Sequence, residues 1–388
     1  MKRTHLAAAC FLGSALVLLG APARAQECLD CHGQPGSSVS FKDGSSKDIT
    51  IDPDAWAASV HGAMGASCTD CHTEHAEYPH PELKAGGARE YTLSHYNSCE
   101  QCHEDQFKKQ LDGVHMKAIA AGNKNAAVCS DCHDPHSQQK ITGEDGKLLP
   151  QGRLAVPQTC ARCHAEIQAK YRESVHGAAL VDGNPDVPTC IDCHGVHDIP
   201  DPRTAAFRLA SPRMCADCHT DAKKMAKYKL STQVLRTYVA DFHGRTVTLF
   251  AEKHPDQQTN KPVCYDCHGF HDVKKVDDPE KGLHVKGNLL RTCQKCHPGA
   301  TENFPDSWLS HYIPDRERAP LVYWVDAFYK VLIPGTLGGM ALFVLTDFAR
   351  RRVDGRRARR AGAEGSGTEP PPPAGEENAA DGGKGGEA

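Results

Sequence analysis

The chain has 388 residues, of which 39% are hydrophobic and 6% aromatic, and its formal net charge is −4. Few side chains are therefore available for a large apolar core, and the chain lacks the strong positive charge of a nucleic-acid-binding protein. It contains 19 cysteines and 23 histidines. We expect that something other than side chains fills the interior, or that much of the chain is irregular.

Residues 1–25 have the pattern of a secretory signal peptide. A positively charged start over residues 1–3 precedes an apolar stretch over residues 6–20, and residues 23–25 read Ala-Arg-Ala, which fits a cleavage site. The mature protein should therefore be exported. Cys10 lies in the apolar stretch, where lipidation is an alternative that would need a longer apolar run before it.

Eighteen of the cysteines form nine Cys-x-x-Cys pairs, and a histidine follows each pair directly. Zinc ribbons and disulfide frameworks use paired cysteines but do not require this histidine. Cys-x-x-Cys-His is the attachment motif for c-type haem, in which two thiols bond to one haem and the adjacent imidazole ligates its iron. The sequence therefore predicts nine covalently bound c-type haems. The predicted haem-bonding cysteines are Cys28, Cys31, Cys68, Cys71, Cys99, Cys102, Cys129, Cys132, Cys160, Cys163, Cys190, Cys193, Cys215, Cys218, Cys264, Cys267, Cys293 and Cys296. The predicted proximal iron ligands are His32, His72, His103, His133, His164, His194, His219, His268 and His297.

The nine motifs are of two kinds. Four of them, which we call long motifs, read Cys-x-Asp-Cys-His-x-x-His, and the other five, the short motifs, lack the second histidine. The long motifs begin at Cys68, Cys129, Cys190 and Cys264, and the short motifs at Cys28, Cys99, Cys160, Cys215 and Cys293. From Cys68 to Cys190 the two kinds alternate every 30 or 31 residues, which indicates a repeat.

Nine further histidines match the nine motifs in number and are candidates for the second axial ligand of each iron. Four are the second histidines of the long motifs, and three others stand in the phrases Ser-Val-His-Gly and Asp-Phe-His-Gly. The candidates are His61, His75, His115, His136, His176, His197, His243, His271 and His311. The tally does not say which histidine serves which haem. Those left over are His80, His95, His254 and His284, of which His95 is the strongest substitute.

Residues 26–320 are predicted to form one haem-binding domain, mainly α with long irregular loops wrapped on a chain of haem-binding repeats. Helices are expected over residues 104–111, 165–173 and 221–241. A hairpin is expected from strands over residues 39–41 and 48–51, around a Lys-Asp-Gly-Ser-Ser turn.

Residues 325–348 are predicted to cross a membrane as one helix, because their apolar run is long enough to do so. Seven arginines follow between residues 350 and 360, which argues against the alternative of a buried core helix. The positive-inside rule then places residues 349–388, basic and then disordered, in the cytoplasm. The haem domain should face the periplasm from a bacterial inner membrane. Gly335 and Gly339 allow contact with another membrane helix, although glycine is common in such helices.

The phrase Ser-Val-His-Gly ahead of a long motif resembles the multihaem c-type cytochromes with doubled Cys-x-x-Cys-His motifs, including the octahaem tetrathionate reductase group. The resemblance covers about residues 26–311 and implies closely stacked haems and electron transfer. Membrane-anchored quinol dehydrogenases of the tetrahaem type carry their anchor at the N-terminus, whereas the anchor predicted here is C-terminal. A quinol site enclosed by this chain alone is therefore not expected.

These observations favour an electron carrier without catalytic residues. It would pass electrons between an integral membrane b-type cytochrome, or another quinol-handling protein, and a periplasmic redox partner. One alternative is an oxidoreductase acting on tetrathionate, nitrite or a related nitrogen or sulfur compound, which needs an iron with an open site. The Cys-x-x-Cys-Lys motif of pentahaem nitrite reductases is absent from the sequence. Another alternative, a structural or sensory haem protein, would need a receiving domain in the tail.

Overall fold

The computed structural model describes residues 25–308, 311 and 313–364. Residues 1–24 of the predicted signal peptide, with Cys10, and the end of the predicted tail, residues 365–388, lie outside the described residues. The chain divides into two compact units, Met1–Tyr312 and Ile313–Ala388. The described part is mainly helical and contains one two-stranded antiparallel ribbon, which confirms the prediction of a mainly α fold.

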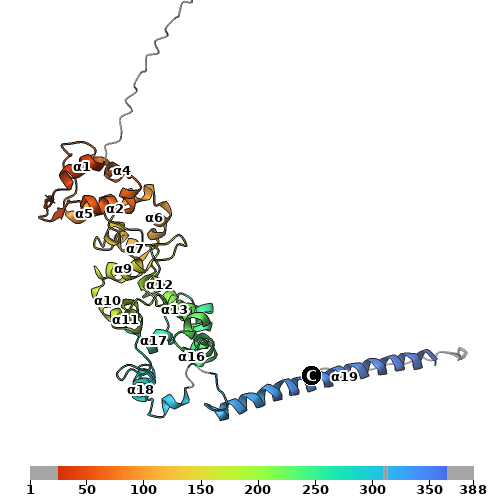
Figure 1. The fold of residues 1–388 in the computed structure, drawn as a ribbon. Helices are drawn as coiled ribbons and strands as arrows, with labels where there is room; N and C mark the ends of the chain where they lie inside the picture. Colours follow the sequence, from red (N-terminus) through yellow and green to blue (C-terminus); the bar gives the residue numbers. More distant parts are fainter. Residues whose placement is uncertain (1–24, 309–310, 312, 365–388) are drawn as a thin grey trace, which may run out of the picture. The chain divides into compact units, whose positions relative to one another are not determined.

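The first unit consists of short helices joined by irregular segments, which follow one another in chain order from α1 to α18 (Figure 1). Its α-helices are α1 (Ala25–His32), α2 (Pro53–Ala58), α3 (Val60–Ala63), α4 (Cys68–Cys71), α5 (Ala88–His95), α6 (Glu104–Leu111), α7 (Val114–Ala120), α8 (Cys129–Cys132), α9 (Pro150–Ala161), α10 (Ala165–Arg172), α11 (Val175–Val181), α12 (Cys190–His194), α13 (Ala205–His219), α14 (Ala222–Ala226), α15 (Val234–Ala240), α16 (Phe242–Lys253), α17 (Cys264–His268) and α18 (Lys286–Gln294). Its 3-10 helices are η1 (Thr73–His75), η2 (Tyr96–Gln101) and η3 (Phe304–Ser307).

The hairpin and one helix differ from the sequence-based expectation. Strand β1 (Ser38–Ser40) pairs with β2 (Ser46–Asp48), earlier than expected, because the turn is tight and Gly44 adopts a left-handed conformation with φ of 84°. The helices expected over 104–111 and 165–173 are α6 and α10. The helix expected over 221–241 is interrupted between α14 and α15, where Lys229 has a φ of 56° that no right-handed helix accommodates.

The apolar core of the first unit is small. Its buried cluster consists of Leu209, Val247 and Val263. Among the side chains that are almost completely buried, the largest are Val263, Ser59 and Ser174, and two of these three are polar. Side chains alone therefore bury little apolar surface in this unit, as the composition led us to expect.

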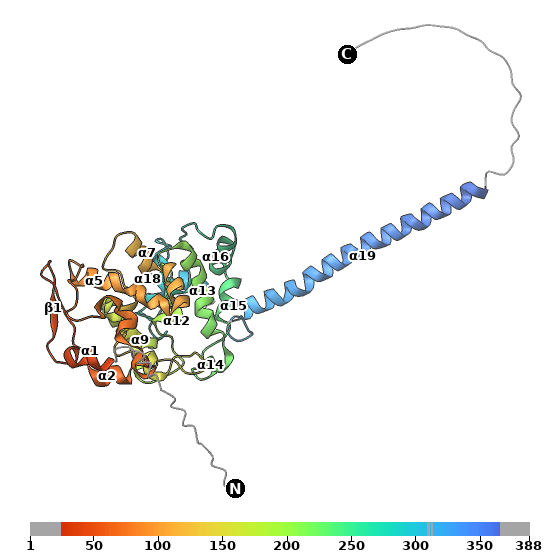
Figure 2. The same cartoon turned by 90° about the horizontal axis from the view of Figure 1, so that it is seen from above.

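The second unit contains α19 (Pro320–Glu364), which Figure 2 shows as one continuous helix. Within residues 320–361 an 18-residue stretch has a mean hydropathy of 1.6 and is not buried, so this helix is long and apolar enough to cross a bilayer. The helix is longer than the predicted span and continues through the arginines, where Arg351 Nε lies 2.7 Å from a carboxylate oxygen of Asp347 one turn earlier. The structure thus contains the candidate membrane helix that the sequence predicts.

Candidate haem-binding sites

Every motif histidine faces a second histidine from another part of the chain, with ring centres 6.0 to 6.3 Å apart. A metal–imidazole bond is about 2 Å long and the ring centre lies about 1 Å behind the nitrogen, so two imidazoles on opposite sides of one metal ion have centres about 6 Å apart. The nine pairs therefore fit the donor set of bis-histidine haem iron. With the motif histidine first, they are His32–His80, His72–His136, His103–His61, His133–His197, His164–His115, His194–His271, His219–His176, His268–His311 and His297–His243.

Eight of the nine candidate second ligands lie opposite a motif histidine of another motif, and His75 is the exception. Its ring centre is 6.3 Å from that of His72 in its own motif and 5.2 Å from that of His80. His80, which the tally left over, is the histidine that faces His32. His72 also lies 5.9 Å from His95. As iron ligands, all of these residues stay predictions.

The pairs follow a rule that the sequence did not reveal. The chain contains four modules, each made of an upstream histidine, a long motif and the next short motif. The upstream histidine faces the short motif of its own module, as His176 faces His219. The second histidine of a long motif faces the long motif of the preceding module, as His197 faces His133. Modules 1 to 4 contain the upstream histidines His61, His115, His176 and His243, in that order.

The two ends of this array depart from the rule. The lone short motif at Cys28 precedes module 1 and has no upstream histidine, and His80 takes that place. No later module supplies a partner for His268 of module 4, which faces His311. His75 belongs to module 1 and has no preceding long motif to face. Its different position therefore follows from where the repeat begins.

The aspartate of each long motif caps the short helix that carries the first cysteine. In α17, Asp266 accepts the backbone N–H of Val263 at 2.6 Å. This bond holds the turn in which the cysteine, the aspartate and the histidine are presented. The equivalent bonds join Ser67 to Asp70 at 2.8 Å, Val128 to Asp131 at 2.7 Å and Thr189 to Asp192 at 2.6 Å.

An arginine of the preceding module pairs with this aspartate in modules 2 to 4. The shortest N–O distances are 2.9 Å for Arg89–Asp131, 3.7 Å for Arg153–Asp192 and 2.8 Å for Arg208–Asp266. The structure shows no such arginine at Asp70 among the residues it describes, as expected for the first module. Sequence reasoning missed these pairs because the spacing between arginine and aspartate differs from module to module.

The phrase around the upstream histidine has a steric origin. A Cβ on Gly177 would lie 1.9 Å from the carbonyl oxygen of Tyr171, so only glycine fits directly after the histidine. Ser174 caps the same helix by accepting the Gly177 N–H at 3.0 Å. The same clash would occur at Gly62 with Trp56 and at Gly244 with Tyr238, both at 2.0 Å. The aromatic residues before these histidines are thus part of the turn that positions the imidazole.

One backbone hydrogen bond recurs between successive modules. The N–H just before the upstream histidine donates to a carbonyl two residues after the second histidine of the next long motif. The bonds are Val60 to Gln138 at 2.8 Å, Val114 to Ile199 at 2.8 Å and Val175 to Val273 at 2.9 Å. Neighbouring modules are therefore joined in the same register along the array.

Several paired imidazoles use Nδ1 for a protein contact, which leaves Nε2 for a metal. Nδ1 of His61 lies 2.9 Å from the carbonyl oxygen of Pro135, and Nδ1 of His80 lies 2.8 Å from that of Glu77. Burial, followed by the charge of the facing histidine, lowers the pKa of both His176 and His268 to about 4. Both imidazoles are therefore neutral at neutral pH, the form in which histidine binds metal ions.

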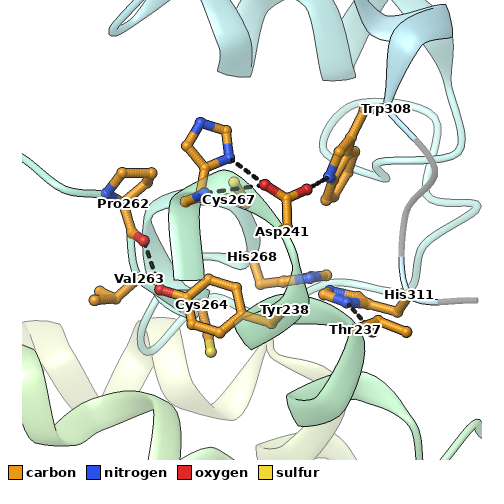
Figure 3. A pocket seen from close by; sticks show the side chains of 11 residues that line it. Thr237, Tyr238, Asp241, Pro262, Val263, Cys264, Cys267, His268, Trp308 and His311 are labelled. Carbon is orange, nitrogen blue, oxygen red and sulfur yellow. Dashed lines mark hydrogen bonds and ion pairs between the residues drawn. The ribbon is translucent and has the colours of Figure 1, made fainter. Parts of the chain in front are cut away.

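The long motif of module 4 shows how one such site is assembled. Cys264, Cys267, His268 and His311 line a single pocket (Figure 3). The rings of His268 and His311 are 6.1 Å apart and inclined by 23°. Thr237 Oγ1 lies 3.3 Å from His311 Nδ1, which orients the imidazole. Two thiols and two imidazoles around one pocket are the groups that a c-type haem requires.

Asp241 connects this pocket with the next site. It accepts a hydrogen bond from Trp308 Nε1 at 2.9 Å (Figure 3). Its carboxylate also lies 3.6 Å from Nδ1 of His243, which faces His297. In modules 1 and 3 a serine occupies the equivalent position. A carboxylate beside a ligating imidazole increases the basicity of the ligand, so this site differs electrostatically from its counterparts.

The cysteines place consecutive motifs side by side. The first cysteine of each long motif lies close to that of the preceding short motif, in the pairs Cys28–Cys68, Cys99–Cys129, Cys160–Cys190 and Cys215–Cys264, and each thiol influences the pKa of the other. Burial is the main cause that raises the pKa of the second thiol of each long motif, and a cysteine of the next short motif adds to it. The nine motifs thus form an unbroken row in chain order.

The described cysteines are free of disulfides, so all eighteen remain available for thioether bonds. No family model, curated protein or solved structure matches the chain, and the sites therefore rest on its own motifs and geometry.

Proposed function

We propose that this protein is a membrane-anchored nonahaem c-type cytochrome that carries electrons between a membrane protein and a periplasmic redox partner. The observation that carries the proposal is that nine Cys-x-x-Cys-His motifs each face a second histidine at the spacing of two imidazoles around one metal ion. When bound, each haem supplies an iron that accepts and releases one electron.

The arrangement of the side chains supports a carrier in preference to an enzyme. Two imidazoles per iron leave no coordination position for a substrate, and they favour low reduction potentials. The thiols of consecutive motifs lie close to one another along the whole row, which supports a continuous path. The oxidoreductase alternative needs one motif histidine without a facing histidine, and each of the nine has one.

The location rests on α19 and the charges that follow it. Its arginine-rich end favours the cytoplasmic side, so the motifs would lie in the periplasm of a bacterial inner membrane. The motif at Cys293 is nearest to α19 in sequence. We expect it to exchange electrons with an integral membrane partner, such as a b-type cytochrome that handles quinol. One helix cannot enclose a quinol site by itself.

The first test is the cofactor content and ligation of the protein purified from membranes. We expect nine haems per chain and an EPR spectrum that contains only low-spin ferric signals. Fewer haems than motifs would contradict the proposal. High-spin signals in the resting protein, or carbon monoxide binding by the reduced protein, would favour the oxidoreductase alternative.

The second test concerns the partner. We expect quinol to reduce the haems in native membranes, and the protein to copurify with a membrane cytochrome. Purification of the chain alone, without reduction by quinol in membranes, would contradict a quinone-linked role.

A further inference from the structure

Two histidines outside the nine pairs lie together near the N-terminal end of the array. The rings of His75 and His95 are nearly parallel, inclined by 8°, with centres 6.4 Å apart. His75 is at the end of η1 and His95 at the end of α5, and Glu74 of η1 contacts both. The other two unpaired histidines, His254 and His284, are exposed and contribute to no comparable cluster in the described part of the chain.

The contact between His95 and Glu74 requires a cation. His95 Nδ1 lies 2.7 Å from the carbonyl oxygen of Tyr91, which fixes the proton of a neutral imidazole on Nδ1. Nε2 then presents a lone pair, yet it directly contacts a carboxylate oxygen of Glu74, which is also an acceptor. Two acceptors meet favourably only when a proton or a metal ion lies between them.

A third ligand lies next to the same carboxylate. His75 Nε2 is 3.4 Å from Glu74 Oε1 and 3.3 Å from the hydroxyl of Tyr91. A nitrogen of His72 also lies within 4.8 Å of the ligand atoms of Glu74 and His95, but His72 is assigned to haem iron by its motif. The set left free is therefore Glu74 and two imidazoles, of which His75 lies near Glu74 but outside the group of atoms within 4.8 Å of one another, so its side chain has to move towards the ion.

The set is reachable from solvent. The side chain of Glu74 is 41% exposed, whereas those of His95 and His75 are 22% and 18% exposed. An ion can thus approach over the carboxylate and meet two half-buried imidazoles. A metal-ligating histidine commonly donates its other ring N–H to a carbonyl oxygen, as His95 Nδ1 does to that of Tyr91.

We propose that Glu74, His95 and His75 bind one divalent non-haem metal ion. Imidazole and carboxylate ligands suit borderline ions, of which zinc is the representative we choose as a probe. The ion would link η1, which follows the first long motif, to α5, and so close the end of the array where the repeat lacks a preceding module. The proposal rests on the proposed function, because haem ligation by the nine pairs is what leaves His75 and His95 free.

The test is zinc binding by the full-length holoprotein in detergent. The protein is incubated with zinc, desalted and analysed for zinc and iron, with the nine haem irons as an internal standard. The variants are Glu74→Gln, His95→Ala and His75→Ala, and the matched control is His254→Ala, which removes an exposed histidine packed on Phe250. Low-spin EPR signals are recorded for each.

We expect about one zinc per nine irons in the wild type and in His254→Ala, and zinc affinity weaker by roughly tenfold or more in the Glu74 and His95 variants. Low-spin signals should stay unchanged in all of them. Equal zinc retention in wild type and Glu74→Gln, with nine irons present, would overturn this site alone. A high-spin haem in His95→Ala or His75→Ala would show that the residue is an iron ligand and would also overturn it. An iron content far below nine would overturn the proposed function and this site together.

Discussion

The interior modules and the N-terminal end of the array complete their histidine pairs in different ways. In the interior, the second histidine of each long motif faces the preceding module, and an arginine–aspartate pair and a backbone hydrogen bond hold each boundary, as for Arg208–Asp266. At the end, the lone motif is completed by His80, from the loop between η1 and α5. The repeat therefore determines which histidines pair in the interior, whereas the pair at the N-terminal end is formed by a nearby loop outside the repeat. The following predictions test this difference.

The largest effect is expected from Gly177→Ala in the interior. Because the added Cβ would lie 1.9 Å from the Tyr171 carbonyl oxygen, the backbone must shift and move His176. We expect a loss of about 1–3 kcal/mol in stability and conversion of one haem to high spin. Denaturant unfolding and EPR measure both. Gly299→Ala is the control, since its Cβ would meet no atom within 4 Å, and identical behaviour of the two variants would contradict the steric argument.

Removal of single histidines tests both the pairing rule of the interior modules and its exception at the N-terminal end. His176→Ala and His80→Ala should each produce one haem that binds carbon monoxide when reduced, because each deletes the partner of a motif histidine. His75→Ala should produce none. Carbon monoxide titration of the reduced protein measures the fraction. If His75→Ala creates the open site and His80→Ala does not, the pairing at the N-terminal end is incorrect.

The boundary between modules 3 and 4 is tested by Arg208→Gln. The guanidinium donates to Asp266 and, at 2.8 Å, to the carbonyl oxygen of Lys261, so its loss leaves partly buried acceptors unpaired. We expect destabilisation of about 1–2 kcal/mol, measured by denaturant unfolding. The exposed pair Arg203–Asp201 provides the control, and Arg203→Gln should leave the midpoint unchanged. Equal effects of both variants would show that the contact at the module boundary stabilises the protein no more than an exposed ion pair does.

The smallest effect is expected from Asp241→Asn, which removes a negative charge near His243. The imidazole becomes a weaker donor, so the reduction potential of one haem should rise. A spectroelectrochemical titration resolves this shift, and Asp315→Asn, outside all the sites, is the control. A titration curve identical to that of the wild type would show that the carboxylate does not tune this iron.

Much of the candidate site could be predicted from the sequence, and the remainder has physical reasons. The motif cysteines and histidines are local patterns, and the phrase around His176 marks three of the four upstream histidines because its glycine is sterically required, whereas Met116 follows His115. The pairing could not be predicted, because a long motif takes its partner from the next module, whereas a short motif takes its partner from its own module. The sequence favours His75 over His80 as a second ligand because His75 belongs to a long motif. No long motif precedes module 1, so His75 has no motif histidine of an earlier module to face, and His80 faces His32 instead.

The mainly helical fold and the apolar helix α19 also followed from the sequence. The break between α14 and α15 could not be predicted from the sequence. The residue in the left-handed conformation there is Lys229, and it is neither a glycine nor a proline. The strands of the ribbon begin earlier than the sequence pattern predicts, and Gly44 in the loop between them has a positive φ.

The backbone hydrogen bonds that join successive modules fix how each module is aligned with the next one. Deletion of one complete module, such as the segment from the upstream histidine of module 2 to that of module 3, would preserve the alternation and leave an equivalent partner for every remaining motif. Deletion of a single motif would bring long and short motifs next to partners of the wrong kind. Histidines before and after the deleted motif would then lack a facing histidine. A chain of this kind can therefore lengthen or shorten by two motifs at a time, and its ends are where exceptions such as His80 and His311 must arise.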